Sequence, residues 1–370
     1  MKKIVLASVL KPVDDCRMYE KFALTLAEEH QVYVLGYKAS DSTFKPAHHR
    51  IQHIELFDFA YKESARSKAS KELLSQLRVI APDIIIIHTI ELLPAAVIHK
   101  MKHPQVKLLY DVQENYIYNF LYQPIHKGVW KYLLATGAMV TELLAAPFIK
   151  HYLLAEKTYL KERKYPSYKC VFLENKFKKP HQELSHVVKQ GHKIQLLICG
   201  TLSTVFGTKE AVLFAIKLHE YNADIMLTIS GKCVEPELAE WLKKTAKTYS
   251  FISMDNIDAL SAHTDIIMAM IRADFVLLPY QPNQSTKNCI PTKLYECLAM
   301  AKPMVIQSNP LWEQVCKPHQ AAVFIDYRNY DPEVVLHKMQ SQEYYPEGEV
   351  YEAFWDTEAP KLLKVMSDMP

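Results

Sequence analysis

The sequence predicts an α/β protein made of two doubly wound domains, each with a parallel sheet between layers of helices. Short runs rich in Ile, Val and Leu alternate with segments of helical periodicity in both halves of the chain. Runs that are apolar throughout fit parallel strands, because helices cover both faces of such a sheet. The 370 residues, 49% of them hydrophobic, are enough for two separate cores.

The first domain is predicted over residues 1–175. Its strands are expected at 4–9, 32–35, 84–88 and 106–111. Met18, Phe22 and Leu26 recur at a spacing of four, which predicts a helix after the first strand. A second helix is expected from about residue 91 to residue 101. Strand, helix and strand in this order indicate parallel βαβ units.

A change of composition marks the expected boundary between the domains. Residues 176–193 read KFKKPHQELSHVVKQGHK, with five lysines, three histidines and little apolar periodicity, and we interpret them as a linker. The second domain is predicted over 194–345, and the tail, 346–370, should contain an amphipathic helix. Strands are expected in the second domain at 194–200, 225–231, 251–254, 275–280, 303–306 and 322–326.

Charge and cysteine usage exclude several classes of protein. The net charge is only +3 and the basic residues are scattered, which argues against nucleic acid as the main partner. Seven cysteines form no C-x-x-C pair, as expected of a chain in a reducing cytoplasm rather than one with a disulfide framework. No D-x-D pair stands at a strand end and no H-E-x-x-H occurs, so we expect no metal site.

The longest apolar stretch, 129–149, is interrupted by Lys131, Glu142 and Pro147. These residues make a membrane span improbable on sequence grounds. The aromatic and partly basic region 116–161 is instead expected to be an internal core helix, a peripheral membrane contact or a homodimer contact.

A candidate ligand site lies at residues 290–306, which read IPTKLYECLAMAKPMVI. Pro291 suits the first turn of a helix, and Lys293 and Glu296 share one face at a spacing of three. A cation at a helix N-terminus is unfavourable unless an anion lies in front of it. The ammonium and carboxylate could together bind a diphosphate and a pair of sugar hydroxyls. The alternative is a solvated ion pair worth about 0.3 kcal/mol.

A second candidate element is the loop in ICGTLSTVFGTKEA, residues 198–211. Gly200 ends a predicted strand and Gly207 precedes a predicted helix. Ligands of open parallel sheets bind beyond the carboxyl ends of strands, where backbone N–H groups and a helix N-terminus can approach a phosphate. A plain tight turn is the alternative.

These two elements resemble a known family. The segment 273–306, ADFVLLPYQPNQSTKNCIPTKLYECLAMAKPMVI, resembles the donor-site signature of GT-B glycosyltransferases related to family 4, with its pattern P-x-K-x-x-E-x-x-A-x-x-x-P. The loop resembles the phosphate loop of the same family. A weaker resemblance extends over nearly the whole chain. It implies a GT-B fold: two Rossmann-like domains with a cleft between them, and a tail helix that crosses back to the first domain.

The resemblance also implies roles for residues in the second domain. Glu296 would hold the ribose hydroxyls of a nucleotide, while Lys293 and the Gly200–Thr201 turn would hold its diphosphate. Asn288 stands where the family often has a further glutamate. The phosphate loop lacks the usual Arg and Lys, and Lys209 or Lys232 could supply the missing charge.

In the first domain, LLYDVQENY at 108–116 resembles the Y-D-x-H-E segment of the family. Asp111 and Glu114 are therefore expected to be catalytic carboxylates that face the cleft, although Gln113 replaces the histidine. A helix cap or turn is the alternative for Asp111. Residues after two other strands are expected on the acceptor side, with capping and core-edge roles as the alternatives: Asp14, Asp15, His88 and Glu91.

The resemblance thus implies a glycosyltransferase of the hexosyltransferase type, acting in cell-surface polysaccharide synthesis, and the missing metal motifs predict that it is metal-independent. It would need no cofactor, because a nucleoside-diphosphate sugar is its co-substrate and a glycan or lipid-linked saccharide is its acceptor. The cytoplasm, or the inner face of the membrane, is the expected location. The alternatives are a nucleotide-sugar epimerase of the same fold and a non-catalytic relative that binds nucleotide.

Overall fold

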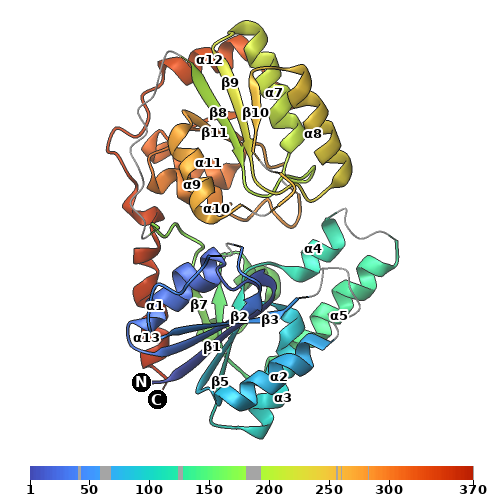
Figure 1. Ribbon diagram of the computed structural model, residues 1–370, viewed down its shortest axis with the longest axis vertical. Helices are drawn as coiled ribbons and strands as arrows, with labels where there is room; N and C mark the ends of the chain where they lie inside the picture. Colours follow the sequence, from blue (N-terminus) through green and yellow to red (C-terminus); the bar gives the residue numbers. More distant parts are fainter. Residues whose placement is uncertain are drawn as a thin grey trace. The chain divides into compact units, whose positions relative to one another are not determined.

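The protein forms two α/β units (Figure 1). The computed structural model describes residues 1–40, 43–58, 68–123, 128–180, 193–255, 257–259, 261–281 and 283–369. Unit 1 comprises Met1–Lys178 together with Trp355–Pro370, and unit 2 comprises Lys179–Phe354. Most of the predicted linker, residues 181–192, lies outside the described residues.

Within the described ranges, unit 1 contains a parallel sheet of seven strands in the order β3-β2-β1-β4-β5-β6-β7. The strands are β1 (Lys3–Pro12), β2 (Gln31–Tyr37), β3 (Ile51–Phe57), β4 (Ile84–Ile87), β5 (Lys107–Val112), β6 (Ile149–Leu154) and β7 (Cys170–Phe172). The direction of winding reverses between β1 and β4, where Ile4 lies opposite Ile84 and Ala7 opposite Ile87. This reversal is the topological switch point of the sheet.

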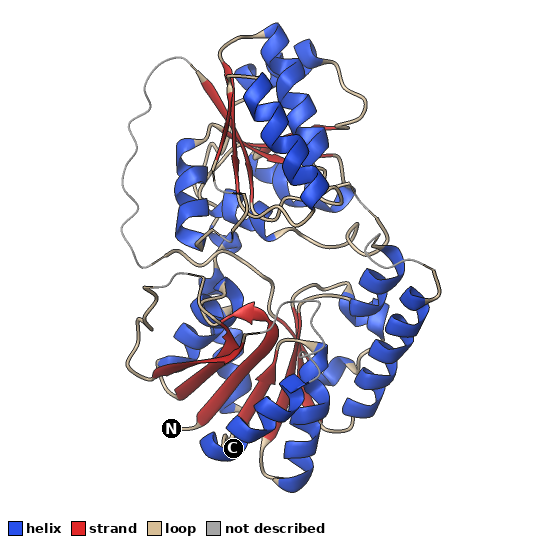
Figure 2. Cartoon of the chain, turned by 45° about the vertical axis from the view of Figure 1, so that its right-hand side comes forward, coloured by secondary structure: helices blue, strands red, loops and turns tan. Residues whose placement is uncertain are grey.

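Helices cover both faces of this sheet (Figure 2). A π-helical segment, η1 (Cys16–Ala23), continues into α1 (Leu24–Ala27), and both pack against the C-terminal α13 (Ala359–Ser367). The other helices lie between β3 and β7 in the chain: α2 (Ala69–Ile80), α3 (Leu93–Lys102), α4 (Tyr116–Tyr122), α5 (Trp130–Ala145) and α6 (Tyr159–Arg163).

Four of these strands were predicted, and β3, β6 and β7 were not. The four isoleucines of β4 are all buried, as a central strand requires. By contrast, β3 is an edge strand in which polar residues such as Gln52 and Glu55 interrupt the apolar pattern. Edge strands carry a weaker apolar signal because one side of the strand is not covered by a neighbour.

The end of the chain completes the core of unit 1. The Trp355 side chain is fully buried, and its ring stacks on Phe22 with centroids 5.6 Å apart. Its indole Nε1 donates to Thr25 Oγ1 at 2.9 Å, and its backbone N–H donates to the Phe177 carbonyl oxygen at 2.6 Å. Seven residues further, in α13, the Leu362 side chain belongs to the same buried cluster.

A buried carboxylate secures this tail. Glu358 is fully buried, and its Oε1 lies 2.7 Å from Lys176 Nζ. Lys361 Nζ donates to the same carboxylate at 2.8 Å, and the backbone N–H of Glu174 donates to its Oε2 at 3.2 Å. Residues 346–354, predicted to belong to the tail, are part of unit 2 instead, where the backbone N–H of Val350 donates to the Leu298 carbonyl oxygen.

The described part of unit 2 contains a six-stranded parallel sheet in the order β10-β9-β8-β11-β12-β13. The strands are β8 (Ile194–Cys199), β9 (Ile225–Ser230), β10 (Ile252–Met254), β11 (Phe275–Leu278), β12 (Met304–Gln307) and β13 (Ala322–Ile325). The helices are α7 (Thr208–Tyr221), α8 (Pro236–Thr248), α9 (His263–Arg272), α10 (Thr292–Ala299), α11 (Pro310–Cys316) and α12 (Pro332–Ser341). All six predicted strands are present.

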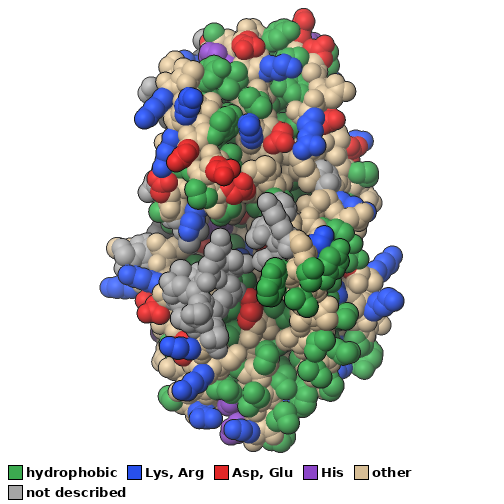
Figure 3. Space-filling model, turned by 90° about the vertical axis from the view of Figure 1, so that its right-hand side faces the viewer, with side chains coloured by type: hydrophobic (Ala, Val, Ile, Leu, Met, Phe, Trp, Pro, Cys, Tyr) green, Lys and Arg blue, Asp and Glu red, His purple; other side chains and the backbone are tan. Residues whose placement is uncertain are grey.

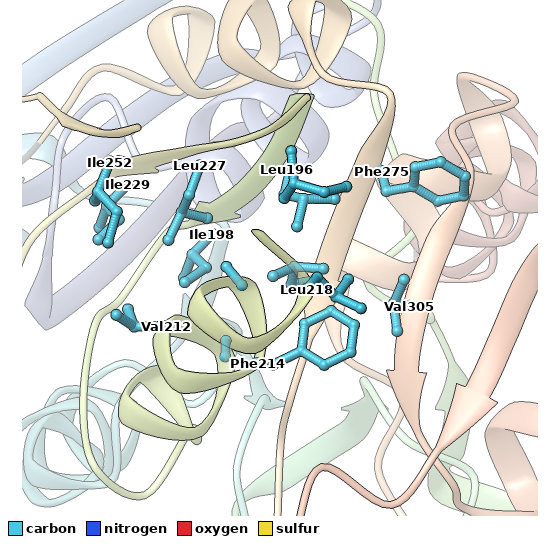
Figure 4. Packing of buried hydrophobic residues seen from close by; sticks show 14 of the residues in the cluster. Leu196, Ile198, Val212, Phe214, Leu218, Leu227, Ile229, Ile252, Phe275 and Val305 are labelled. Carbon is cyan, nitrogen blue, oxygen red and sulfur yellow. The ribbon is translucent and has the colours of Figure 1, made fainter. Parts of the chain in front are cut away.

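Helix α7 packs on the middle of this sheet (Figure 4). Its Val212, Phe214 and Leu218 side chains are fully buried against strand residues such as Leu196 and Leu227. The apolar face of the helix and the apolar runs of the strands thus form one continuous core. This core fixes the position of the loop between β8 and α7.

Replacing Trp355 should destabilise unit 1 selectively. Trp355→Ala removes a fully buried indole and its hydrogen bond to Thr25, which should lower the free energy of unfolding by about 3–5 kcal/mol. Hydrogen exchange read by mass spectrometry should show faster exchange in peptides of unit 1 and unchanged exchange in peptides of unit 2. Tyr351→Ala, at a nearby exposed position, is the matched control. Equal acceleration in both units would contradict the assignment of the tail.

Candidate functional site

Three of the predicted donor residues of unit 2, Gly200, Lys293 and Glu296, belong to segments that follow β8 and β11. These strands are neighbours, and the winding of the sheet reverses between them. Gly200 follows β8 directly, and α10, which carries Lys293 and Glu296, begins in the segment that follows β11. Sheet topology therefore places the two sequence elements together at the switch point, where open α/β sheets bind ligands.

Lys293 and Glu296 form a buried ion pair. Lys293 Nζ lies 2.5 Å from Glu296 Oε2, and the two side chains are only 13% and 2% exposed. The other carboxylate oxygen, Oε1, lies 3.3 Å from His263 Nε2, at the start of α9. A solvated surface pair does not fit this burial.

Both members of the pair are held in their charged forms. Burial alone would raise the pKa of Glu296, but Lys293 and His263 outweigh it and lower the pKa to about 2. Burial likewise opposes the charge on Lys293, yet the neighbouring Glu296 raises its pKa above the usual range. Desolvation offsets much of the attraction within a buried pair, but loss of one charge leaves the other buried without a partner and is destabilising. Strongly shifted groups at a strand end are typical of functional sites.

Two glycines bring the phosphate-loop backbone close to this pair. A Cβ on Gly231 would lie 2.0 Å from the Gly200 carbonyl oxygen, and the Gly231 φ of +135° is unfavourable for other residues. Gly200 itself has a φ of +100°, and a Cβ there would lie 3.3 Å from Lys293 Cε. The close approach thus places the backbone that follows β8 next to the aliphatic part of the Lys293 side chain.

The loop after Gly200 is held by contacts within the protein. The Thr204 backbone N–H and hydroxyl donate to Glu235 at 2.8 and 2.6 Å. The Ser203 N–H donates to Thr208 Oγ1, and the Phe206 N–H donates to Ser203 Oγ. A phosphate that used the Thr204 N–H would have to displace Glu235.

The remaining predicted donor residues have different environments. Lys209 Nζ lies 5.2 Å above the Trp241 ring of α8, so the cation contacts an aromatic face. Lys232 follows Gly231 and is half-buried, and its carbonyl oxygen accepts from the Leu202 N–H. Thr201 is exposed, and Asn288 is half-buried in the segment before α10.

In unit 1, a second buried ion pair stands at the carboxyl ends of β1 and β5. Arg17 binds Asp111 through two contacts, Nε to Oδ2 at 2.9 Å and Nη2 to Oδ1 at 2.6 Å. Gln113 Nε2 donates to the same Oδ2 at 2.9 Å. Although burial opposes ionisation, Arg17 and His88 hold the pKa of Asp111 below its usual range.

His88, after β4, contacts this carboxylate through Nδ1 at 2.8 Å. An ionised carboxylate only accepts hydrogen bonds, so Nδ1 carries a proton in this contact. Nε2 is buried and has no hydrogen-bond partner among the described residues. The Asp111 carboxylate is fully buried and does not face solvent. Its hydrogen bonds instead hold the His88 and Arg17 side chains in place.

The other residues predicted in unit 1 have different environments. Asp15 caps η1 by accepting from the N–H groups of Arg17 and Met18, and Asp14 accepts from the Ser40 N–H at 2.9 and 2.8 Å. The Asp15 contacts are capping contacts, whereas Asp14 ties down the chain after β2. Glu114 is exposed and accepts a hydrogen bond from Asn119 Nδ2 at 2.8 Å. Glu91, three residues after His88, is half-buried.

Several site residues were missed at the level of sequence. Arg17, His263 and Glu235 bind residues that lie 94, 33 and 31 positions away in the chain. Nothing in the local spacing connects them with their partners. Among the described residues, no group of three or more His, Cys, Asp or Glu side chains is arranged to hold a metal ion.

No family model matches the sequence, and no curated protein matches it in sequence. Solved structures are similar to it over the whole chain. Sucrose-phosphate synthase from Thermosynechococcus elongatus has a TM-score of 0.70 at 10% identity, covering 100% of this chain and 99% of that one. HepE from Anabaena, solved with UDP and glucose, has a TM-score of 0.66 at 10% identity, with 99% of each chain covered.

UDP-GlcNAc 2-epimerase from Neisseria meningitidis, bound to UDP-GlcNAc, is also similar, with a TM-score of 0.62 at 10% identity and 99% of each chain covered. The predicted GT-B fold is therefore confirmed: two Rossmann-like α/β units with parallel sheets. Glycosyltransferases and epimerases share this fold.

The Lys293–Glu296 pair should make the stability of unit 2 depend on acid pH. The pKa of Glu296 is about 2 in the fold and 4.5 for a free side chain, so its stabilising effect is complete above pH 4.5 and is lost as pH falls towards 2. The difference corresponds to about 3 kcal/mol of unfolding free energy. Urea unfolding from pH 7 to pH 3 should show wild type losing more stability than Glu296→Gln.

Glu313→Gln is the control, because Glu313 forms a more exposed pair with Lys317 at 2.7 Å. Its unfolding free energy should follow that of wild type through the whole pH range. If the Glu296→Gln curve also runs parallel to wild type, the pair is not held in its charged form.

Proposed function

We propose that this chain is a glycosyltransferase related to family 4, which moves a sugar from a nucleoside-diphosphate sugar to a glycan or lipid-linked acceptor in cell-surface polysaccharide synthesis. The observation that carries the proposal is the buried Lys293–Glu296 pair beside Gly200, at the switch point of unit 2. Structural neighbours solved with UDP, with UDP-glucose or with ADP support a nucleotide-sugar ligand.

When the donor binds, Lys293 and Glu296 each exchange the other for a group of the donor. The diphosphate replaces Glu296 as the anion next to Lys293, and the α10 N-terminus adds partial positive charge at the same place. Glu296 Oε2, released from Lys293, accepts hydrogen bonds from the ribose hydroxyls. His263 stays on Oε1, so the buried carboxylate keeps a partner throughout.

Lys293 then supports departure of the nucleotide. Negative charge grows on the diphosphate as the glycosidic bond breaks, and a fixed cation stabilises that charge more in the transition state than in the ground state. Because its pKa is raised, Lys293 remains ionised through neutral pH. This cation and the N-terminus of α10 serve the purpose for which other enzymes use a divalent metal, so we expect metal-independent transfer.

Unit 1 would supply the acceptor side. Asp111 fixes the Nδ1–H form of His88 and orders Arg17, which makes it a positioning residue. Glu114 is the exposed carboxylate of the same strand end and is available to contact an acceptor hydroxyl. Acceptor-side roles for Asp14, Asp15 and Glu91 stay predictions.

A donor panel tests the function directly. Nucleoside diphosphates are first screened by thermal shift, and sugars of the stabilising nucleotide are then incubated with and without glycan or lipid-linked acceptors in the presence of EDTA. We expect nucleotide release that depends on the acceptor and a new glycosidic product. Formation of an epimer from donor alone would overturn transfer in favour of an epimerase. Binding without turnover across the panel would favour a non-catalytic relative.

Replacing each member of the ion pair should affect different kinetic constants. Lys293→Met should lower kcat about 100-fold, since it removes one preorganised charge that acts in the transition state. Glu296→Gln should mainly raise the donor KM, because the ribose hydroxyls do not change during the reaction. Initial rates over a range of donor concentrations separate the two effects.

Lys243→Met is the control for charge, since Lys243 is an exposed lysine of unit 2 that pairs with Asp258 at 2.8 Å and has no predicted role in the site. Its kcat should stay within a few-fold of wild type. Melting curves must show that all three variants are folded, because a buried charge without its partner is destabilising. Wild-type constants in both Lys293→Met and Glu296→Gln would place the donor site elsewhere.

A further inference from the structure

Helix α5 exposes an unusually apolar face. Nine large hydrophobic side chains on the helix and at its start are more than a third exposed, with Leu143 at 70% and Leu144 at 67%. We call this set the α5 surface: Val129, Trp130, Tyr132, Leu133, Leu134, Met139, Val140, Leu143 and Leu144. Patches of this kind on soluble proteins mark interaction sites.

The side of α5 that faces unit 1 is made of smaller and more polar residues. Ala135, Ala138, Ala145 and Glu142 are the buried residues of the helix. Glu142 forms an ion pair with Arg163 and accepts a hydrogen bond from Tyr165 at 3.0 Å. The amphipathic pattern expected of a surface helix is therefore inverted, with the large apolar side chains outside. Folding of unit 1 alone leaves them in water.

The charge of the segment that contains α5 indicates the partner of the α5 surface. Residues 116–169 contain eight Lys or Arg and three Glu. Glu142 and Arg163 pair with each other, which leaves seven Lys and two Glu, and Glu162 accepts from Asn115. Figure 3 shows hydrophobic side chains gathered on this face of unit 1, with Lys and Arg near their margin. An apolar patch with basic residues at its edge is complementary to anionic lipid.

Aromatic residues at the start of the helix point to the same partner. Trp130 is 71% exposed, and Lys131 Nζ lies 4.9 Å over the Tyr132 ring, with Tyr122 of α4 exposed nearby in the chain. Trp and Tyr are enriched at the boundary between lipid and water, because they have an apolar body and a polar end. None of the described helices is long and apolar enough to cross a bilayer. The α5 surface would thus lie in the plane of the interface.

We propose that the α5 surface binds an anionic lipid bilayer, with its leucine and aromatic side chains at the acyl boundary and the neighbouring lysines on lipid phosphates. A second copy of the chain fits less well, because a two-fold contact would place the same basic margin opposite itself. This inference is independent of the proposed function, since it depends only on contacts of unit 1.

Vesicle co-sedimentation tests the proposal. We expect the full chain to pellet with vesicles of phosphatidylcholine and phosphatidylglycerol, to bind vesicles of phosphatidylcholine alone more weakly, and to lose part of its binding at high salt. The double variant Leu143→Gln with Leu144→Gln should lower the partition constant about tenfold or more, because two exposed leucines no longer enter the apolar layer.

Leu213→Gln is the matched control, as Leu213 is 49% exposed on α7 in unit 2. It should partition like wild type, and circular dichroism should show that every variant keeps its fold. Failure to bind the anionic vesicles, or equal binding to both kinds of vesicle, would overturn the proposal. A dimer seen by light scattering without lipid, and lost in the double leucine variant, would overturn it in favour of a second copy.

Discussion

A buried charge has to be paired, and both units meet this requirement at the carboxyl ends of their central strands. Arg17 and Asp111 satisfy it in unit 1, and Lys293 and Glu296 satisfy it in unit 2. Neither pair would be stable next to an apolar core unless the backbone delivered its members to within hydrogen-bond distance. Parallel winding does this, because consecutive strands end at the same edge of the sheet.

The two ion pairs differ in whether they leave room for a ligand. Asp111 is surrounded by Arg17, His88 and Gln113, so it has little room for another ligand. Glu296 has two partners, and in the proposed function its ion pair with Lys293 is exchanged for an incoming anion. Under that proposal, the same physical requirement produces a rigid support in one unit and an exchangeable pair in the other.

Sequence reasoning succeeded where the signal is local and failed where it is not. The buried isoleucines of β4 and the Lys293–Glu296 spacing are visible within a few residues, and the first led to a correct strand. The edge strand β3 carries too many polar residues for an apolar run to reveal it. His263 and Arg17 enter their sites only through packing of distant segments, so no spacing rule could connect them with Glu296 or Asp111.

The return of the chain to unit 1 at Trp355 has a consequence for biosynthesis. The ribosome makes the chain from its N-terminus, so all of Lys179–Phe354 is translated before Trp355 exists. Until then no indole ring stacks on Phe22, and the backbone N–H of Glu174 has no Glu358 carboxylate to which it can donate. Translation of unit 2 is therefore complete before translation of unit 1, although unit 2 starts later in the chain. While unit 2 is being translated, the core of the nascent unit 1 is therefore incomplete. This is the stage at which chaperones would act on it.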